Sequence, residues 1–268
     1  MSIKLVAVDV DDTLLNSRKE LTPAVREAIE AVKARGTRFT IATGRDIRGL
    51  QRFQDILSPA VPVITYNGAE IRMSGSGELI SAVCLLENCA LEIIRRGLEK
   101  GFSVIVWSKG VLYIGQPGIY SRGYSDMYGI QERELSDKDI APLAKLGITK
   151  VIWAGERGLI GNLERAYRVN PIPGSDCCTS DPSYLEFMAE GVNKGAGLRA
   201  AAEALNLSSA EVMAVGDGHN DLPMLRWAGL AVAMGNASEE VKSAAGYVTD
   251  SCEEDGLAKA LHRFILPE

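Results

Sequence analysis

Residues 3–13 read Ile-Lys-Leu-Val-Ala-Val-Asp-Val-Asp-Asp-Thr, and this stretch decides how the fold is interpreted. It begins with a short apolar run rich in β-branched side chains, which predicts a buried strand. Two carboxylates, Asp9 and Asp11, follow where that strand ends. In an open α/β sheet, ligands bind beyond the carboxyl ends of the strands. Carboxylates crowded there need a proton or a cation between them, and Mg2+ is their natural companion. A polar turn of solvated aspartates is the simpler alternative.

The segments on either side of this stretch alternate between strand and helix patterns. A helix is predicted to begin at Thr22-Pro23 and to end at Gly36, because Pro suits the first helical position and Gly the residue after the last turn. Apolar strands are predicted next at residues 38–42 and 61–65. The rhythm returns after Glu190, with a helix at 194–205 and a strand at 212–215. Strands that alternate with helices predict βαβ units and a parallel sheet.

The middle of the chain has a different pattern. Turn-forming residues near 73–77 and 108–110 indicate hairpins rather than crossovers, and residues 116–126, rich in Gly and Tyr, are predicted to be irregular. We therefore predict an α/β fold with two parts. A Rossmann-like parallel-sheet core comprises residues 1–82 and 189–268, and an inserted α+β cap domain comprises residues 83–188.

Composition excludes several classes of function. The chain has 268 residues, 46% of them hydrophobic and 24% charged, which is normal for a globular protein. Its net charge of -6 and pI near 5.2 argue against binding to nucleic acid or an anionic membrane. No apolar run is long enough to span a membrane, and no secretory segment precedes the first strand. Five cysteines without a CxxC spacing predict reduced thiols and a cytoplasmic location.

Polar side chains with complementary chemistry occupy several predicted strand and helix ends. Phosphoryl transfer needs a nucleophile, a cation, donors to the phosphate oxygens and an acid for the leaving oxygen. Asp9 can attack phosphorus and form an aspartyl-phosphate, while Asp11 can protonate the leaving oxygen and then deprotonate water. Asp217 can complete a metal site, and Thr43 and Lys194 can hold phosphate oxygens.

Each of these residues also has a simpler interpretation. Gly44 gives the backbone room to approach a ligand, but Thr43 can equally cap the following helix. A lone lysine such as Lys194 is more often solvated, and aspartates in a Gly-rich loop, such as Asp217, are often turn residues. Arg45 is expected to be a surface or supporting residue. The functional interpretation depends on all these segments occurring together.

In that combination and order, the segments resemble the haloacid dehalogenase (HAD) superfamily, and specifically its Cof-like subgroup with a type IIB (C2B) cap. The matching segments are Asp9-Val10-Asp11-Asp12-Thr13-Leu14, Thr43-Gly44-Arg45, Gly191-Val192-Asn193-Lys194-Gly195 and Gly216-Asp217-Gly218-His219-Asn220-Asp221. The resemblance covers essentially the whole chain. One departure is Asp12, which stands where the family usually has Gly.

The resemblance implies a Mg2+-dependent phosphatase that acts on small phosphorylated metabolites, such as a sugar phosphate or phosphoglycolate. It implies that Asp9 is the nucleophile and Asp11 the general acid and base. The metal would bind the Asp9 carboxylate, the Asp11 carbonyl and Asp217, with Asp221 in the supporting acidic loop. The residues expected to bind substrate or phosphate are Thr43, Gly44, Asn193, Lys194 and Asn220. Asn67-Gly68 matches a segment that the family places near the substrate.

Two alternatives share the same phosphorylated aspartate. A phosphomutase would return the phosphate to a sugar rather than to water. A non-enzymatic receiver-like switch would hold a long-lived phospho-aspartate, although an acid at Asp11 and an insertion of this size speak against it. The expected partner is a small phosphorylated metabolite, with no nucleic acid and no membrane, and the chain is expected to be a monomer or a weak homo-oligomer.

Overall fold

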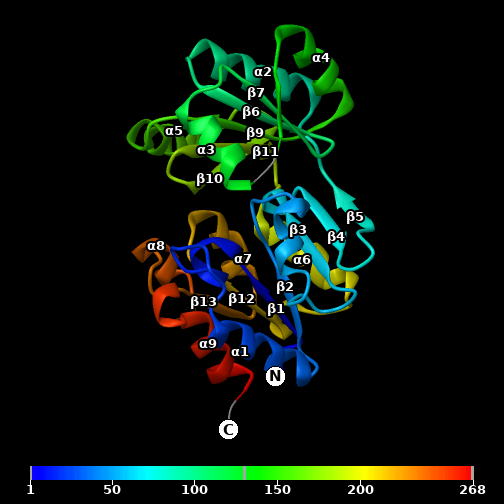
Figure 1. Ribbon diagram of the computed structural model, residues 1–268, viewed down its shortest axis with the longest axis vertical. Coiled ribbons are helices and arrows are strands. Elements are labelled where there is room, and N and C mark those ends of the chain that lie inside the picture. The colour runs from blue at the N-terminus through cyan, green and yellow to red at the C-terminus, as the bar shows by residue number, and fades with distance from the viewer. Residues whose placement is uncertain (1, 129–130, 267–268) are drawn as a thin grey trace. The chain divides into compact units, whose positions relative to one another are not determined.

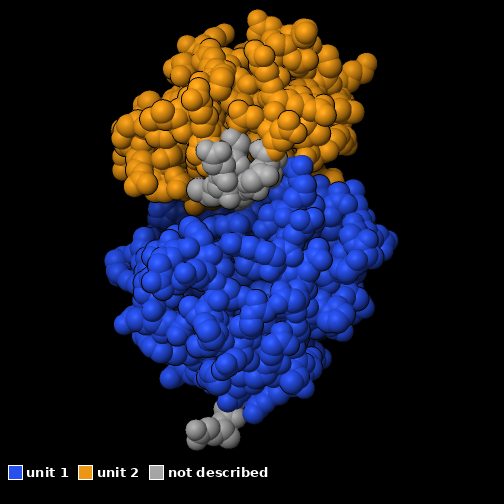
Figure 2. Space-filling model, in the orientation of Figure 1, with its two compact units in different colours: residues 1–81, 193–268 blue, residues 82–192 orange. Residues whose placement is uncertain are grey.

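The computed structural model describes residues 2–128 and 131–266, except for the side chains of residues 125–128. The chain forms two compact units, one made of residues 1–81 and 193–268 and the other of residues 82–192 (Figure 2). None of the helices in the described part combines the length and apolar character that a bilayer crossing requires.

The first unit is built on a five-stranded parallel sheet in the order β14-β13-β12-β1-β2 (Figure 1). Its strands are β1 (Leu5–Val8), β2 (Arg38–Ile41), β12 (Val212–Gly216), β13 (Leu230–Ala233) and β14 (Tyr247–Val248). Strand β1 lies between β2 and β12. Two strands about 200 residues apart in sequence therefore end side by side, as expected of βαβ connections.

Helices cover both faces of this sheet because its strands are apolar on both sides. Val6 and Val8 pack with α1 (Pro23–Ala34) and α9 (Gly256–Phe264), whereas Leu5 and Ala7 pack with α6 (Lys194–Ala204) and α7 (Leu222–Trp227). Alternate side chains of one strand point to opposite faces, so β1 contributes to both layers of the core. A shorter helix, α8 (Glu239–Ser243), packs near β13.

The prediction that residues 61–65 extend the parallel sheet is largely wrong. Strand β3 (Pro62–Thr65) belongs to a separate three-stranded sheet with β4 (Glu70–Met73) and β5 (Leu79–Ala82), and it pairs antiparallel with β4. A single parallel bridge, Ala42 to Ile64, connects it to the end of β2. The tight turn at residues 66–69 explains the difference, because it returns the chain directly as a hairpin partner.

The second unit contains a six-stranded sheet in the order β10-β11-β9-β6-β7-β8. Its described pairs are antiparallel except β7 with β8. The strands are β6 (Ser103–Ser108), β7 (Val111–Gly115), β8 (Glu132–Glu134), β9 (Ile148–Ala154), β10 (Ser175–Asp181) and β11 (Tyr184–Ala189). In the core of this unit, Trp153 stacks on Phe102, and its ring centroid lies 4.7 Å from that of Phe187. With the parallel sheet of the first unit, this arrangement confirms the predicted α/β fold class.

Helices α2 (Glu87–Glu99), α4 (Asp137–Leu146) and α5 (Arg157–Val169) pack in this unit, together with α3 (Ile119–Tyr128). The prediction of irregular structure at 116–126 is wrong, because α3 occupies most of that segment. Its Ser121 and Tyr124 side chains are buried, and the Tyr124 hydroxyl accepts a hydrogen bond from Trp107 Nε1 at 3.1 Å. Tertiary packing of this face outweighs the poor helix propensity of Gly and Tyr.

Candidate active site

Asp9 lies immediately beyond the carboxyl end of β1. Its backbone amide donates to the Val215 carbonyl of β12 at 3.0 Å, which places it next to Gly216 and Asp217. Its side chain is buried, with 8% of the residue exposed. The following turn, η1 (Val10–Leu14), leaves the sheet with Asp12 in the left-handed region at φ 58°. The family's usual Gly suits that conformation, and Asp is among the few other residues that adopt it readily.

Lys194 lies between two carboxylates. Its Nζ donates to Asp9 Oδ1 and to Asp221 Oδ1, each at 2.6 Å, and only 1% of the residue is exposed. Although burial opposes a charge on this amine, the two carboxylates raise the pKa of Lys194 above its ordinary value. Lys194 is the first residue of α6, a position unfavourable for a cation near the helix dipole, so the carboxylates decide its charge.

Asp221 organises the loop that follows β12. Its Oδ2 accepts hydrogen bonds from the backbone amides of Asp217 at 3.0 Å and Gly218 at 2.9 Å. Together with the Lys194 bond on Oδ1, these contacts engage both oxygens of a fully buried carboxylate. Asp221 therefore fixes the backbone from which the Asp217 side chain projects.

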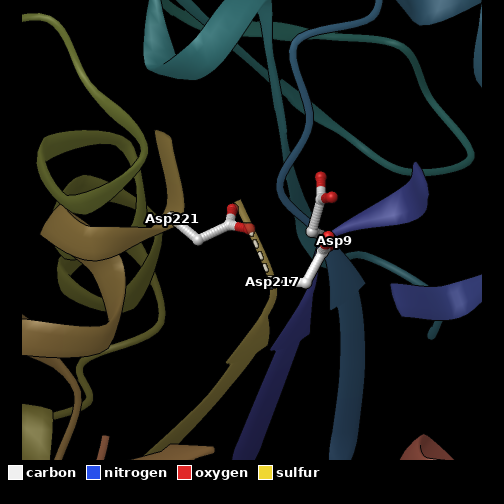
Figure 3. Close-up of side chains that lie close together, drawn as sticks. All are labelled: Asp9, Asp217 and Asp221. Carbon is white, nitrogen blue, oxygen red and sulfur yellow. Dashed lines mark hydrogen bonds between the residues drawn. The ribbon is translucent and has the colours of Figure 1, made fainter. Parts of the chain in front are cut away.

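Three carboxylates gather beyond the ends of β1 and β12 (Figure 3). One oxygen from each of Asp9, Asp217 and Asp221 lies within 4.8 Å of the other two. Burial and the surrounding carboxylates, opposed by Lys194, raise the pKa of Asp9 well above its ordinary value. Burial and Asp221 raise the pKa of Asp217 to about 7, although a 2.7 Å hydrogen bond from Thr13 Oγ1 opposes the shift. Three carboxylates thus lie together, and Lys194 contacts two of them.

This donor set fits a hard divalent cation. Carboxylate oxygens are the ligands that Mg2+ prefers, and a second cation would offset the burial and the repulsion that raise both pKa values. Asp9 and Asp217 are the better ligand candidates, because both oxygens of Asp221 already accept hydrogen bonds. The predicted metal residues Asp9 and Asp217 thus belong to a group of three carboxylates that could hold one ion.

The Asp11 carboxylate is not one of these three, and basic side chains contact it. Arg45 Nε donates to Asp11 Oδ2 at 3.0 Å, and Arg45 Nη2 donates to Oδ1 at 2.6 Å. Lys19 Nζ lies 3.2 Å from Oδ1. Despite opposition from burial, Arg45 and Lys19 lower the pKa of Asp11 from its ordinary value. The carboxylate is therefore an anion in this arrangement.

The remaining predicted residues surround the ends of β2 and α6. Thr43 is buried, its Oγ1 accepts from the Arg45 amide at 3.2 Å, and the preceding amide of Ala42 donates to Val8 in β1. Thr43 therefore lies at the strand end next to Asp9. Asn193 caps α6 by accepting from the Ala196 amide at 2.9 Å.

Asn220 donates from Nδ2 to Asn67 Oδ1 at 3.1 Å. A side chain at Gly44 would lie 3.1 Å from the same Asn67 oxygen, so these segments are tightly packed. Asn67 itself has a φ of 56° in a turn that links β3 to β4. Asn67 thus contacts both of the sequence-predicted segments at Gly44 and Asn220.

Comparison with known proteins supplies the family. The haloacid dehalogenase-like hydrolases match residues 6–261. The chain belongs to this family. The prediction of a haloacid dehalogenase-like hydrolase is therefore confirmed.

Several relatives of this haloacid dehalogenase-like hydrolase align over nearly the whole chain. It is 33% identical to the protein YxeH of Bacillus subtilis over 98% of both chains. It is 29% identical to the 5-amino-6-(5-phospho-D-ribitylamino)uracil phosphatase YcsE of the same organism, over 99% of this chain and 97% of that protein. A solved structure of the HAD subclass IIB sugar phosphatase BT4131 superposes with a TM-score of 0.86, at 27% identity, over 97% of this chain and 98% of that one.

Two contacts of this haloacid dehalogenase-like hydrolase were not anticipated from sequence. Thr13 orients Asp217, and Arg45, which is only 6% exposed, holds Asp11. Both residues stand inside the segments that carry the resemblance, so their position was a usable signal. Their partners were not predictable, because each bond joins side chains brought together only by the sheet.

Proposed function

We propose that this hydrolase is a Mg2+-dependent phosphatase of small phosphorylated metabolites that works through an aspartyl-phosphate on Asp9. The observation that carries the proposal is the buried set in which Lys194 joins Asp9 to Asp221 while Asp217 lies beside them. A nucleophilic carboxylate next to an ammonium group and a second acidic ligand is the arrangement that phosphoryl transfer requires.

The chain's own residues then have distinct roles in the proposal. Lys194 holds Asp9 Oδ1, so that Oδ2 can attack phosphorus as the ester oxygen departs. Asp11, which Arg45 and Lys19 favour as an anion, must first take up a proton from solvent, which it then donates to that leaving oxygen. It later takes a proton from the water that hydrolyses the aspartyl-phosphate. Asp9, Asp217 and the Asp11 carbonyl would hold Mg2+, which supplies charge neutralisation for the transferring phosphoryl group.

Phosphate would be held by groups around the ends of β2 and α6. The proposed set consists of Thr43, Gly44, Asn193, Lys194 and Asn220. Thr43 lies at the strand end next to Asp9, and Lys194 contacts Asp9 directly. Asn193 and Asn220 have side-chain partners in this structure, so they would contribute backbone or remaining amide groups.

The substrate class rests on the chemistry that the relatives share. YcsE and the pyridoxal phosphate phosphatase YbhA of Escherichia coli, 26% identical over 99% of this chain, are named for different phosphate monoesters of small molecules. The structure compared above is a sugar phosphatase. A small phosphate monoester, such as a sugar phosphate or phosphoglycolate, is the proposal consistent with all three. We also infer a cytoplasmic location, since all five cysteines are free thiols.

A direct test measures inorganic phosphate released from p-nitrophenyl phosphate and from a panel of sugar phosphates, phosphoglycolate and pyridoxal phosphate. We expect turnover with Mg2+, none in excess chelator, and recovery when Mg2+ is restored. Full activity in chelator would remove the metal from the mechanism. If the phosphoryl group is instead found on a different hydroxyl group of the sugar, the protein is a phosphomutase. If a stable phospho-aspartate forms without turnover, the protein is a switch.

A further inference from the structure

Arg45 makes a two-point contact with Asp11 that the proposed phosphatase mechanism has not used. The guanidinium approaches both carboxylate oxygens, Nε to Oδ2 at 3.0 Å and Nη2 to Oδ1 at 2.6 Å. A bidentate contact of this kind fixes the plane of the carboxylate as well as its position. The Arg45 side chain is 7% exposed and that of Asp11 is 29% exposed. A buried guanidinium therefore binds a carboxylate that remains accessible to solvent.

The backbone of Arg45 is fixed from two directions. Its amide donates to Thr43 Oγ1 at 3.2 Å, and its carbonyl accepts from the Tyr66 amide at 3.0 Å. The first contact ties Arg45 to the end of β2, and the second ties it to the turn after β3. Because this backbone is anchored to two strand ends, the guanidinium is a pre-organised support rather than a mobile surface charge.

Lys19 contacts the same carboxylate. Its Nζ lies 3.2 Å from Asp11 Oδ1 and 3.1 Å from Asp12 Oδ1. Asp12, the residue that replaces the family's usual Gly, thus places a second acceptor next to Lys19. Lys19 is more exposed than Arg45, with 39% of its side chain accessible, so it is the weaker constraint.

We propose that Arg45 is a positioning residue that holds the Asp11 carboxylate in the orientation from which it accepts a proton from the hydrolytic water. This proposal rests on the proposed function. In that step the water oxygen bonds to phosphorus and the bond between phosphorus and the Asp9 oxygen breaks. The water proton passes to Asp11, and inorganic phosphate leaves. The Asp11 carboxylate must face the water when it attacks, and the two-point contact from Arg45 fixes the plane and position of that carboxylate.

The two half-reactions can be separated with p-nitrophenyl phosphate. Nitrophenolate is a good leaving group and needs no proton from Asp11, so formation of the aspartyl-phosphate does not depend on Arg45. We expect Arg45→Met to give a rapid burst of nitrophenolate close to one per active site, followed by a steady state slowed about 10- to 100-fold. The kcat and KM should fall together while kcat/KM stays near the wild-type value, because kcat/KM reports only the steps through phosphorylation.

Three comparisons exclude a merely structural role. Arg45→Lys keeps the charge but loses the fork, so it should recover part of the steady-state rate. Arg26→Met is the matched control: it removes a guanidinium of the same unit that pairs with Asp55 rather than with Asp11, and it should leave both phases unchanged. In an Asp11→Asn background, Arg45→Met should have no further effect, because its role passes through Asp11.

Other outcomes would overturn the inference. If Arg45 bound substrate, Arg45→Met would lower kcat/KM and show no burst. If it were only structural, its effect would persist in the Asp11→Asn background and would track the loss of folded protein in thermal unfolding. If the wild type hydrolyses the ester and Arg45→Met has the same steady-state rate, only the role inferred for Arg45 is wrong. A wild-type protein without turnover sinks the proposed function as well.

Discussion

Lys194 and Asp9 stand 185 positions apart in sequence, yet the lysine Nζ and the aspartate Oδ1 lie 2.6 Å apart in the protein interior. The same ammonium group also contacts Asp221 at 2.6 Å. A buried charge is stable only when it is paired and hydrogen-bonded, and here one cation serves two anions. Lys194 is therefore needed both for the stability of this site and for its electrostatics.

Lys194→Met tests that dependence. Removing the ammonium group leaves Asp9 and Asp221 buried without their cation, so we expect the free energy of unfolding to fall by about 3–5 kcal/mol. Hydrolysis of an aryl phosphate should be lost in the fraction that remains folded. Chemical unfolding followed by circular dichroism measures the first effect, and phosphate release measures the second.

A matched control lies in the second unit. Lys150 is buried to the same degree and pairs with Glu186 at 3.0 Å, so Lys150→Met removes a comparable ammonium group from the unit that does not contain Asp9. We expect it to lower stability but to leave transfer of the phosphoryl group to Asp9 intact. In Asp9→Asn/Lys194→Met, one of the two stranded carboxylates is gone, and part of the lost stability should return. A Lys194→Met protein as stable and active as wild type would contradict both roles.

Asp9→Asn should abolish hydrolysis while preserving the fold. The amide cannot form an acyl phosphate, so kcat for p-nitrophenyl phosphate should fall by about 10^4-fold or more, as with other catalytic nucleophiles. Removing one charge from three crowded carboxylates relieves repulsion, and Lys194 keeps its bond to Asp221. The thermal midpoint should therefore be unchanged or raised. Asp55→Asn, at an exposed aspartate, serves as the control, and residual turnover like that of wild type would exclude Asp9 as nucleophile.

Much of this arrangement was predictable because local sequence and one topological rule determine it. The apolar run before Asp9 predicted a buried strand, and parallel strands share an edge, which predicted that Asp217 would lie close to Asp9. Periodicity also placed Lys194 at the start of a helix. These inferences need only the strand and helix pattern, without knowledge of any side-chain partner.

The features that sequence did not predict depend on tertiary packing. Arg45 gives no periodic signal that it would turn inward to Asp11, because the choice of partner follows from where β2 and β3 end. The helix at α3 was missed because its buried face compensates for unfavourable residues. Strand β3 has the apolar character of a parallel strand, and only the turn at Asn67 reveals that it pairs antiparallel.

Asp12→Gly restores the residue that the resemblance leads us to expect at this position. At φ 58° and ψ 16°, Asp12 has a conformation that Gly adopts freely, so the substitution relieves backbone cost but removes a carboxylate partner of Lys19. We expect these effects to offset each other, with a change in unfolding free energy within about 1 kcal/mol and with activity retained. Asp12→Val should cost about 1–2 kcal/mol, since a β-branched residue is strained there. Equal stability of the Gly and Val variants would contradict the backbone argument.

The stability of the metal-free protein should depend on pH through Asp217. Its folded-state pKa of about 7 lies above its ordinary value of 3.8, so the folded protein holds this proton more tightly than the unfolded chain does. The contribution of this bound proton to the free energy of unfolding is fully present below pH 3.8 and is lost as the pH rises through about 7. Thermal unfolding in chelator should show this decline, and Asp217→Asn should lessen it.

Mg2+ should reverse that decline, because the ion binds the ionised carboxylates and competes with their protons. The rise in Tm on adding Mg2+ should therefore be larger at pH about 8 than at pH about 5.5. In Asp217→Asn the rise should be small at both values. If the metal-free wild type became more stable relative to Asp217→Asn as the pH rises from about 5.5 to about 8, the pKa of Asp217 would not be raised.

Gly68→Ala tests whether the turn after β3 positions the start of α6. Gly68 has a φ of 100°, and a Cβ built there would lie 2.3 Å from the Asn193 carbonyl oxygen, one residue before Lys194. The methyl group must displace that backbone, so both stability and aryl phosphate hydrolysis should fall. Gly75→Ala is the matched control, because Gly75 has a φ of 79° but no heavy atom lies within 4 Å of the new Cβ. Its free energy of unfolding should therefore fall only by the conformational cost of about 1 kcal/mol. If both variants lost the same stability and kept full activity, contact between this turn and α6 would have no part in placing Lys194.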